Sequence, residues 1–265
     1  ESVMSLAIDR NARNLAVSLS FYGRAAERAG VLLITAPVRY SVFNIAVLAA
    51  PVTGGPEGEF ERRLGVARDH YEEIGTPWSF WLCEDYLPRR DLRRMSRIFE
   101  DFGLDCIGEP PGMEMAELGA PVRVLPEVEI RRVEDEETRS GFTRLANACF
   151  RLPMPYASAV YENEEAWKHP LTMWTAWEKG RVVASAATVA AHGALGIYSV
   201  GTLPELRGRG YAEAVMRRAI AEARAGGAAG PLILQSSPAG LNLYRKLGFK
   251  TTTRFSVFAT PESRR

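Results

Sequence analysis

A short turn rich in glycine and arginine is the segment of this chain best suited to chemistry. Arg207, Gly208, Arg209 and Gly210 precede a segment whose apolar residues recur at three- and four-residue steps, which predicts a helix beginning at Tyr211. The first turn of a helix has free backbone N–H groups at the positive end of the helix dipole. Glycines let an anion approach these groups closely, and two arginines add full charges. The turn therefore predicts a phosphate or diphosphate site.

A plainer interpretation of the same turn stays open. Gly208 and Gly210 would then only shape a tight turn, with both arginines in solvent, because short glycine motifs often match by chance. The turn is not a P-loop, since no Gly-Lys-Ser/Thr follows, and it lacks the three-glycine spacing of a dinucleotide-binding turn. The neighbouring sequence favours the phosphate site.

Two motifs in this order resemble the GNAT superfamily of N-acyltransferases. Residues 202–212, Thr-Leu-Pro-Glu-Leu-Arg-Gly-Arg-Gly-Tyr-Ala, contain an Arg-x-x-Gly-x-Ala frame similar to the acetyl-CoA-binding motif of that family. Residues 232–249 resemble its second signature, a strand and a helix that close on Leu-Tyr-Arg-Lys-Leu-Gly-Phe. The resemblance covers roughly residues 128–261. Two independent motifs at the right separation are more specific than either alone.

The resemblance implies acetyl-CoA as co-substrate, with its diphosphate at the turn and its pantetheine arm paired along a strand edge. A backbone N–H near residues 200–203 would polarise the thioester carbonyl, and Gly201 is expected to mark a β-bulge there. Ser237 stands where many members have asparagine, and its hydroxyl can still bond the pantetheine amides. The residues implied to bind the cofactor are Thr202, Leu203, Arg207, Gly208, Arg209, Gly210, Tyr211, Ala212 and Ser237.

Tyr244 is the expected catalytic residue. Attack of a neutral amine on a thioester requires oxyanion stabilisation and a proton for the departing thiolate, and no covalent enzyme intermediate. The resemblance places Tyr244 near the thioester sulfur, where a phenol with an ordinary pKa of about 10 would donate that proton. The alternative is a core aromatic beside Leu241, Leu243 and Leu247.

No general base is assigned. Many members use a carboxylate on the strands that face the amine, yet residues 195–200 contain none. His192 and Tyr198 are nearby candidates, although His192 lies in a predicted turn, and a water chain is the alternative.

The acceptor pocket is expected to draw on residues 148–169. Phe150, Tyr156, Tyr161 and Trp167 would line it, or they would form the ordinary core of a helical cover. Both interpretations stay open.

Composition narrows the class of protein. The chain has 265 residues, of which 46% are apolar and 25% charged, and its net charge is +1. That balance disfavours nucleic-acid binding by bulk charge, and no apolar stretch approaches the roughly 18 residues of a membrane span. Three cysteines and three histidines are scattered without metal-ligand spacing, so no metal is expected. A cytoplasmic protein that acts on a small-molecule amine is expected, and a homodimer is left open.

The elements that position these residues are expected in two halves. Residues 118–126, with two prolines and a glycine, are the expected boundary, which gives domains 1–124 and 125–265. The second half has three strands joined by tight turns, followed by alternating helices and strands. This pattern predicts an α/β (α+β) fold with a mixed, mostly antiparallel sheet flanked by helices, repeated as two tandem GNAT-like domains.

The first half contains an echo of the second. Ile98–Leu104 aligns with Leu243–Phe249 without a gap, and Arg62–Ala67 aligns with Arg207–Ala212, both at an offset of 145 residues (98 to 243, 62 to 207). Two matches at one offset predict a duplicated domain. An unrelated α/β domain that shapes the substrate cleft is the alternative.

The echo is altered where the chemistry would be. Phe99 replaces Tyr244 and lacks the hydroxyl, while Arg63 and Leu64 replace Gly208 and Arg209. The acidic residues nearby, which would repel a diphosphate, are Glu57, Glu59 and Glu61. The first half is therefore predicted to be a degenerate copy with a partial motif and no bound cofactor.

The leading functional interpretation is an acetyl-CoA-dependent N-acetyltransferase acting on a primary amine of a small molecule. A non-catalytic acyl-CoA-binding sensor or regulatory module is the alternative, because the carboxylate base is missing. A phosphate-binding domain of another fold leaves the second motif unexplained.

Overall fold

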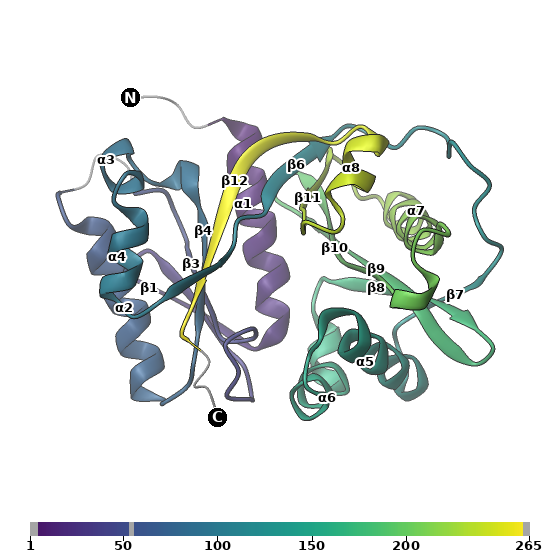
Figure 1. The fold of residues 1–265 in the computed structure, drawn as a ribbon, viewed down its shortest axis with the longest axis horizontal. Helices are drawn as coiled ribbons and strands as arrows, with labels where there is room; N and C mark the ends of the chain where they lie inside the picture. The colour runs from purple at the N-terminus through teal and green to yellow at the C-terminus, as the bar shows by residue number, and fades with distance from the viewer. Residues whose placement is uncertain (1–4, 53–55, 262–265) are drawn as a thin grey trace. The chain divides into compact units, whose positions relative to one another are not determined.

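The computed structural model describes residues 5–52 and 56–261. By its internal contacts the chain divides into two compact units. The first unit comprises Glu1–Met113, Gln235–Asn242 and Thr251–Arg265, and the second comprises Glu114–Leu234 and Leu243–Lys250. The elements of both units are labelled in Figure 1.

The first unit is built on a mixed sheet. The strands follow the order β1-β2-β3-β4-β12, and β5 pairs with the other edge of β12. All neighbours are antiparallel except the parallel pair of β3 and β4. The strands are β1 (Arg24–Arg28), β2 (Val31–Thr35), β3 (Ile45–Leu48), β4 (Ser79–Cys83), β5 (Asp105–Gly108) and β12 (Lys250–Ala259). The next strand along the chain is β6 (Pro111–Met115).

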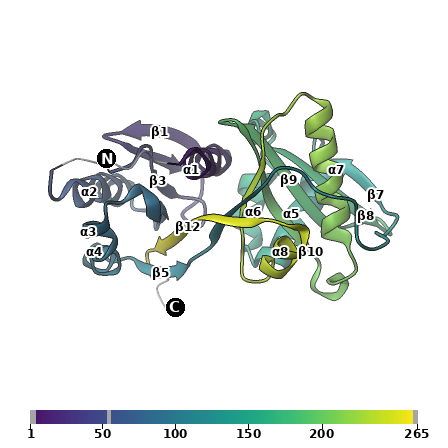
Figure 2. The same ribbon diagram turned by 90° about the horizontal axis from the view of Figure 1, so that it is seen from above.

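Helices flank this sheet on both faces. Figures 1 and 2 both show helix α1 on one face of the sheet and helices α2 and α4 on the other. The helices are α1 (Leu6–Leu19), α2 (Glu59–Glu73), α3 (Arg89–Leu92) and α4 (Met95–Asp101), with short 3-10 turns at Ser20–Tyr22 and Glu84–Tyr86.

The last strand of the chain lies in the sheet of the first unit. Phe255 pairs with Cys83 of β4, and Ala259 pairs with Asp105 of β5 on the opposite edge. The ring of Phe258 is buried and stacks on Phe99 with centroids 3.7 Å apart. The expected boundary after residue 124 places this strand in the second domain, whereas its contacts place it in the first unit. The difference arises because strand pairing joins segments that are far apart in sequence. The hypothesis of two tandem copies stays a prediction.

The second unit contains a mostly antiparallel sheet in the order β11-β10-β9-β8-β7. The predicted meander is confirmed, because β8, β9 and β10 pair antiparallel in sequence order. Lys179-Gly180 and His192-Gly193 connect them as turns with positive φ at both positions, as two-residue hairpins favour. The strands are β7 (Glu129–Arg132), β8 (Thr172–Glu178), β9 (Arg181–Ala191), β10 (Ala194–Thr202) and β11 (Leu232–Gln235).

Helices also cover both faces of this second sheet. Figure 1 shows α7 on one face and α5 and α6 on the other. Helix α5 begins at a capping box, in which Asp135 accepts from the Thr138 amide and Thr138 accepts from the Asp135 amide. The helices are α5 (Glu136–Phe150), α6 (Met154–Tyr161), α7 (Tyr211–Ala225) and α8 (Leu241–Leu247), with 3-10 turns at Glu164–Lys168 and Pro204–Leu206.

The predicted fold class is confirmed: the sheets are mixed, mostly antiparallel and flanked by helices. None of the helices in the described part of the chain is long and apolar enough to cross a membrane.

Candidate functional site

The glycine turn leads directly into α7, as the sequence predicts. Gly208 and Gly210 have φ of 77° and 91°, a backbone region that strains side chains with a Cβ. Gly210 is the N-cap residue and offers no side-chain cap, and the first helical bond runs from the Ala214 N–H to its carbonyl. The preceding amides of the helix have no intrahelical acceptor. They are therefore donors for an anion at this end of α7.

Two arginines of the turn keep their charge for a ligand. The Arg207 Nε donates to the Thr202 carbonyl at 3.2 Å, which holds the side chain against the end of β10. The Arg209 Nη2 donates to the Glu205 carbonyl at 3.4 Å. Within residues 5–52 and 56–261 neither arginine forms an ion pair, so neither positive charge is neutralised by a carboxylate.

A third arginine reaches the turn from the segment before β7. The Arg123 Nη1 donates to the Gly208 carbonyl at 3.1 Å, and its Nε lies 3.9 Å from a carboxylate oxygen of Glu213. Glu213 is buried and also bonds Arg217 at 2.9 Å. The sequence does not reveal Arg123, because it lies in an irregular segment 85 residues from its acceptor.

Strand β10 extends beyond its pairing with β11. The two parallel strands pair only at Leu195 with Leu232 and at Gly196 with Ile233, while β10 continues to Thr202. The register between the two strands runs no further than Gly196 with Ile233. An extended group can therefore pair with this part of the β10 edge, as an added strand does.

The expected β-bulge in β10 is confirmed. The register with β9 shifts between Tyr198 and Gly201, and Ser199 has a φ of 50°. The Ser185 hydroxyl donates to the Ser199 carbonyl at 2.7 Å, which fixes the bulge. Val200, inside the shift, has no partner residue in β9. A bulge re-aims the backbone, so the amide of Val200 is the best candidate to polarise a carbonyl.

Leu203 and Gly201, which lie beside the bulge, contribute to the packing and hydrogen bonding of the sheet. The Leu203 N–H donates to the Val183 carbonyl at 2.9 Å, so this amide is occupied by the sheet. A Cβ on Gly201 would lie 2.9 Å from the ring of Phe150, so glycine lets that ring pack against β10.

Tyr244 is the most buried residue of α8. Burial raises the pKa of its phenol well above the ordinary value. Its ring packs edge-on against Phe249 with centroids 5.7 Å apart. In the described part of the chain its hydroxyl has no hydrogen-bond partner, yet this atom is not among those sealed from solvent. The phenol is thus protonated at neutral pH and open to a new acceptor.

Cys149 lies next to the bulge, and its surroundings disfavour the thiolate. Its Cβ is 3.5 Å from the position of a Cβ on Gly201. Burial raises the pKa of the Cys149 thiol to about 11, although the nearby charge of Arg207 lowers it in part. The thiolate is the reactive form of cysteine, so this side chain agrees with direct attack by the amine.

The two candidate bases differ in position. His192 is exposed in the turn before β10, and at about 3.3 Å per residue it lies roughly 25 Å from Val200 along the strand. It is therefore too far from the bulge to act there. Tyr198 pairs with Ala187 immediately before the bulge and is half-buried.

The aromatic residues expected around the acceptor divide into two groups. Tyr161 and Trp167 both pack edge-on against Phe142, and the indole N–H of Trp167 donates to the Tyr161 carbonyl, as in an ordinary core. Phe150 is 37% exposed and lies against Gly201 beside the bulge. Tyr156 is half-buried on α6.

Ser237 lies in the part of the chain that belongs to the first unit. It is exposed, and its hydroxyl accepts from the Gly240 N–H at 3.3 Å. Among the residues described, no cluster of three or more His, Cys, Asp or Glu is arranged to hold a metal ion.

The aligned segment in the first half has a different local structure. Residues 62–67 lie inside α2, so their Arg-x-x-Gly-x-Ala frame forms no turn. The N-cap of α2 is Gly58, with a φ of 84°. The aligned helix ends, by contrast, share a local structure. The Leu104 amide donates to the Phe99 carbonyl, and the Phe249 amide donates to the Tyr244 carbonyl, both at 3.0 Å.

A bulge in β10 is followed by a glycine turn at the start of α7, which is the arrangement expected from the resemblance to GNAT acyltransferases. The match to a family model agrees: residues 139–249 match the acetyltransferase (GNAT) family. The match lies in the second half of the chain, where the sequence also resembles that family.

Solved structures share the fold over most of the chain. A GCN5-related N-acetyltransferase from Kribbella flavida is 19% identical with a TM-score of 0.72, and the match covers 98% of each chain. A conserved Staphylococcus epidermidis protein of unknown function is 12% identical with a TM-score of 0.62, covering 91% of this chain and 95% of that one. A GCN5-related N-acetyltransferase from Sphaerobacter thermophilus is 15% identical with a TM-score of 0.55, covering 88% and 78%. Curated protein sequences give no match.

Proposed function

We propose that this acyltransferase moves an acetyl group from acetyl-CoA to the primary amine of a small molecule by direct attack. One observation carries the proposal: β10 bulges at Ser199 after its pairing with β11 has ended, and the same strand leads into the turn at Gly208 and Gly210. The part of β10 beyond its register with β11 suits the pantetheine amides, and the helix start suits the diphosphate.

The residues of this chain supply three functions in the proposed reaction. The amides of the first turn of α7, with Arg207 and Arg209, hold the diphosphate. The Val200 amide donates to the thioester carbonyl and stabilises the oxyanion that forms there. Tyr244, whose pKa is raised by burial, keeps its proton and donates it to the leaving thiolate.

The acceptor side supports a small molecule. Phe150 is partly exposed beside the bulge, and Tyr198 lies next to it on β10. The missing carboxylate means that the amine must lose its proton to water or to Tyr198. A small apolar or aromatic amine fits these surroundings better than a basic peptide, which would favour an acidic groove.

An amine-dependent thiol assay tests the proposal. Purified protein is mixed with acetyl-CoA and a panel of small primary amines, and released thiol and acetylated amine are measured together. Equal amounts of both products are expected with at least one amine. Binding of acetyl-CoA without amine-dependent release would favour the sensor, which the missing carboxylate keeps as the second candidate. Absence of coenzyme A binding would overturn both.

A further inference from the structure

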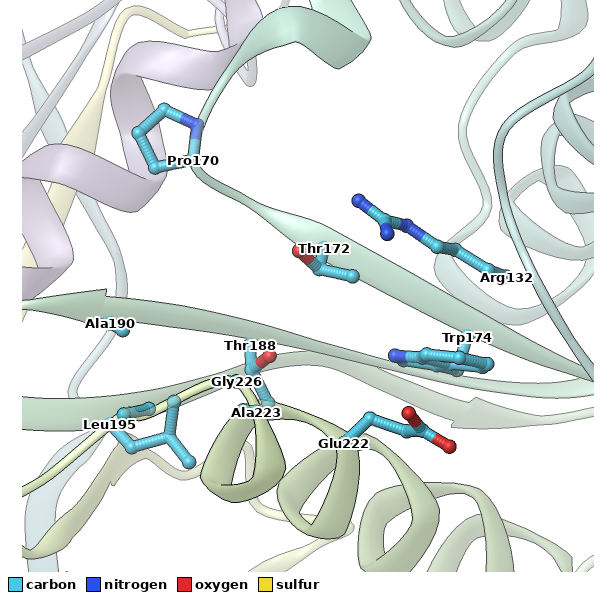
Figure 3. A pocket seen from close by; sticks show the side chains of 11 residues that line it. Arg132, Pro170, Thr172, Trp174, Thr188, Ala190, Leu195, Glu222, Ala223 and Gly226 are labelled. Atoms are coloured by element: carbon cyan, nitrogen blue, oxygen red, sulfur yellow. The ribbon is translucent and has the colours of Figure 1, made fainter.

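A cavity in the second unit is separate from the transfer site. It has a volume of about 330 Å³ and lies between the sheet and the C-terminal end of α7 (Figure 3). The space exists because the facing residues are small, among them Ala190, Ala223 and Gly226. Its volume is at the lower end for small-molecule pockets, which span about 300–1,000 Å³.

The cavity is remote from the glycine turn. Glu222 lines it, and at 1.5 Å per residue Glu222 lies about 16 Å along the helix axis from Tyr211. Leu195 lines it at the beginning of β10, whereas the bulge is near the end of that strand. The cavity is therefore distinct from the proposed cofactor site.

A buried donor in this cavity lacks an acceptor. The indole nitrogen of Trp174 is sealed from solvent and has no hydrogen-bond partner in the described residues. Leaving such a group unpaired is costly, so a native structure that keeps one calls for an explanation. Figure 3 shows this nitrogen directed toward the cavity. Because the nitrogen is sealed from solvent, neighbouring side chains must shift slightly before a bound molecule can accept from it.

A cation points into the same space. Arg132 pairs with Trp174 across β7 and β8, and its guanidinium projects into the cavity in Figure 3. In the part of the chain that the structure describes, this guanidinium has no carboxylate partner. Thr172 and Thr188 form a cross-strand pair that also lines the cavity and offers two hydroxyls.

The acidic residue at the rim is already neutralised. The Glu222 carboxylate accepts from the Arg218 Nε at 2.7 Å, and the Arg218 guanidinium lies 5.4 Å from the ring centre of Trp174. The polar end of the cavity therefore keeps a net positive charge. The other end is apolar, with Pro170, Ala190 and Leu195.

We propose that this cavity binds a small organic monocarboxylate. Its carboxylate accepts from the Trp174 indole N–H and the Arg132 guanidinium, because charged acceptors make the stronger hydrogen bonds. Its apolar part extends toward Pro170 and Leu195. Such a compound neutralises the free cation and satisfies the unpaired donor together. The proposal does not rest on acetyl transfer, since it concerns a different end of α7.

Matched ligands test the charge requirement. Hexanoate and benzoate, with hexanamide and benzamide as neutral counterparts, are titrated into the full-length protein by calorimetry. At least one carboxylate is expected to bind 10-fold or more tightly than its amide. The Trp174 indole N–H resonance, assigned with Trp174→Phe, is expected to move downfield on saturation. Absence of binding by both carboxylates, or equal binding of acid and amide, would overturn the proposal.

Variants test the site itself. Arg132→Met is expected to weaken binding at least 10-fold, and Trp174→Phe, which keeps a ring without the N–H, several-fold. Arg144→Met removes the same charge from α5 on the opposite face and is expected to leave affinity unchanged. Equal losses in the Arg132 and Arg144 variants would mean a general charge effect and would contradict the assignment. If Trp174→Phe does not fold, the wild-type protein is used instead. Indole N–H resonances that all stay unmoved at saturating carboxylate would then contradict the assignment.

Discussion

The starts of helices α2 and α7 resemble each other in backbone and differ in charge. Both begin at a glycine with positive φ, Gly58 at 84° and Gly210 at 91°, without a side-chain cap. In α2 the carboxylate of Glu59 in the first turn bonds both Arg62 and Arg63. The hydrogen bonds from Arg62 and Arg63 lower the pKa of Glu59 to about 2, so its carboxylate is ionised at neutral pH. Within the described residues, the arginines of the turn before α7 bond backbone carbonyls and no carboxylate.

The strands before the two helices differ as well. Strand β3 stays paired with β4 over three residues of its four, whereas β10 pairs with β11 over two of its nine. An anion site therefore requires more than a helix start: it needs cations without internal partners and a strand edge left open.

The largest expected effect is on cofactor affinity. Arg207→Glu with Arg209→Glu should weaken coenzyme A binding more than 100-fold, which is about 2.7 kcal/mol, because two attractions become repulsions. Calorimetry measures this loss. The matched control, Arg62→Glu with Arg63→Glu in α2, should leave the affinity within twofold. One coenzyme A per chain is expected, and two would contradict a degenerate first half.

Loss of the Tyr244 hydroxyl should reduce turnover next most. Tyr244→Phe removes the proposed proton donor and is expected to lower kcat about 100-fold, as for other general acids. Coenzyme A affinity should stay nearly constant, and a melting curve checks that the fold is kept. An unchanged kcat would show that the ring has only a packing role.

Replacing Gly210 or Gly65 by alanine should change the free energy of unfolding in opposite directions. Gly210→Ala places a Cβ at a φ of 91° and 3.2 Å from Pro126, which is expected to cost about 1–2 kcal/mol of unfolding free energy. Gly65→Ala lies inside α2, where the nearest atom is 3.9 Å away, and should add about 0.5–1 kcal/mol. Urea unfolding measures both. A loss at Gly65 would mean that residue 65 is not an ordinary helical position.

The smallest expected signal is the alkylation of Cys149. Its thiol pKa of about 11 leaves little thiolate at pH 8, so reaction with iodoacetamide should be slow and should rise steadily toward pH 11. Peptide mass spectrometry distinguishes it from Cys106, which is exposed and should react first. Rapid alkylation of Cys149 at pH 7 would indicate an activated thiol and reopen a covalent mechanism.

The local features of the second half were predictable from sequence, and the long-range ones were not. The meander, the turn at Gly208 and Gly210 and the helix after it follow from spacing and turn residues that act over a few positions. Arg123 and the open edge of β10 depend on pairing across dozens of residues. The sequence match at residues 62–67 also does not reveal the local structure: these residues lie inside α2, and the start of that helix is earlier, at Gly58.

The position of β12 has a consequence for how the protein is made. This strand is translated after all the other described strands, yet it lies between β4 and β5 and carries Phe255 and Phe258 into the first unit. Many domains complete their folding in order during synthesis, the N-terminal one first. Here the sheet of the first unit lacks its strand between β4 and β5 until residues 250–259 have been translated, after the strands of the second sheet.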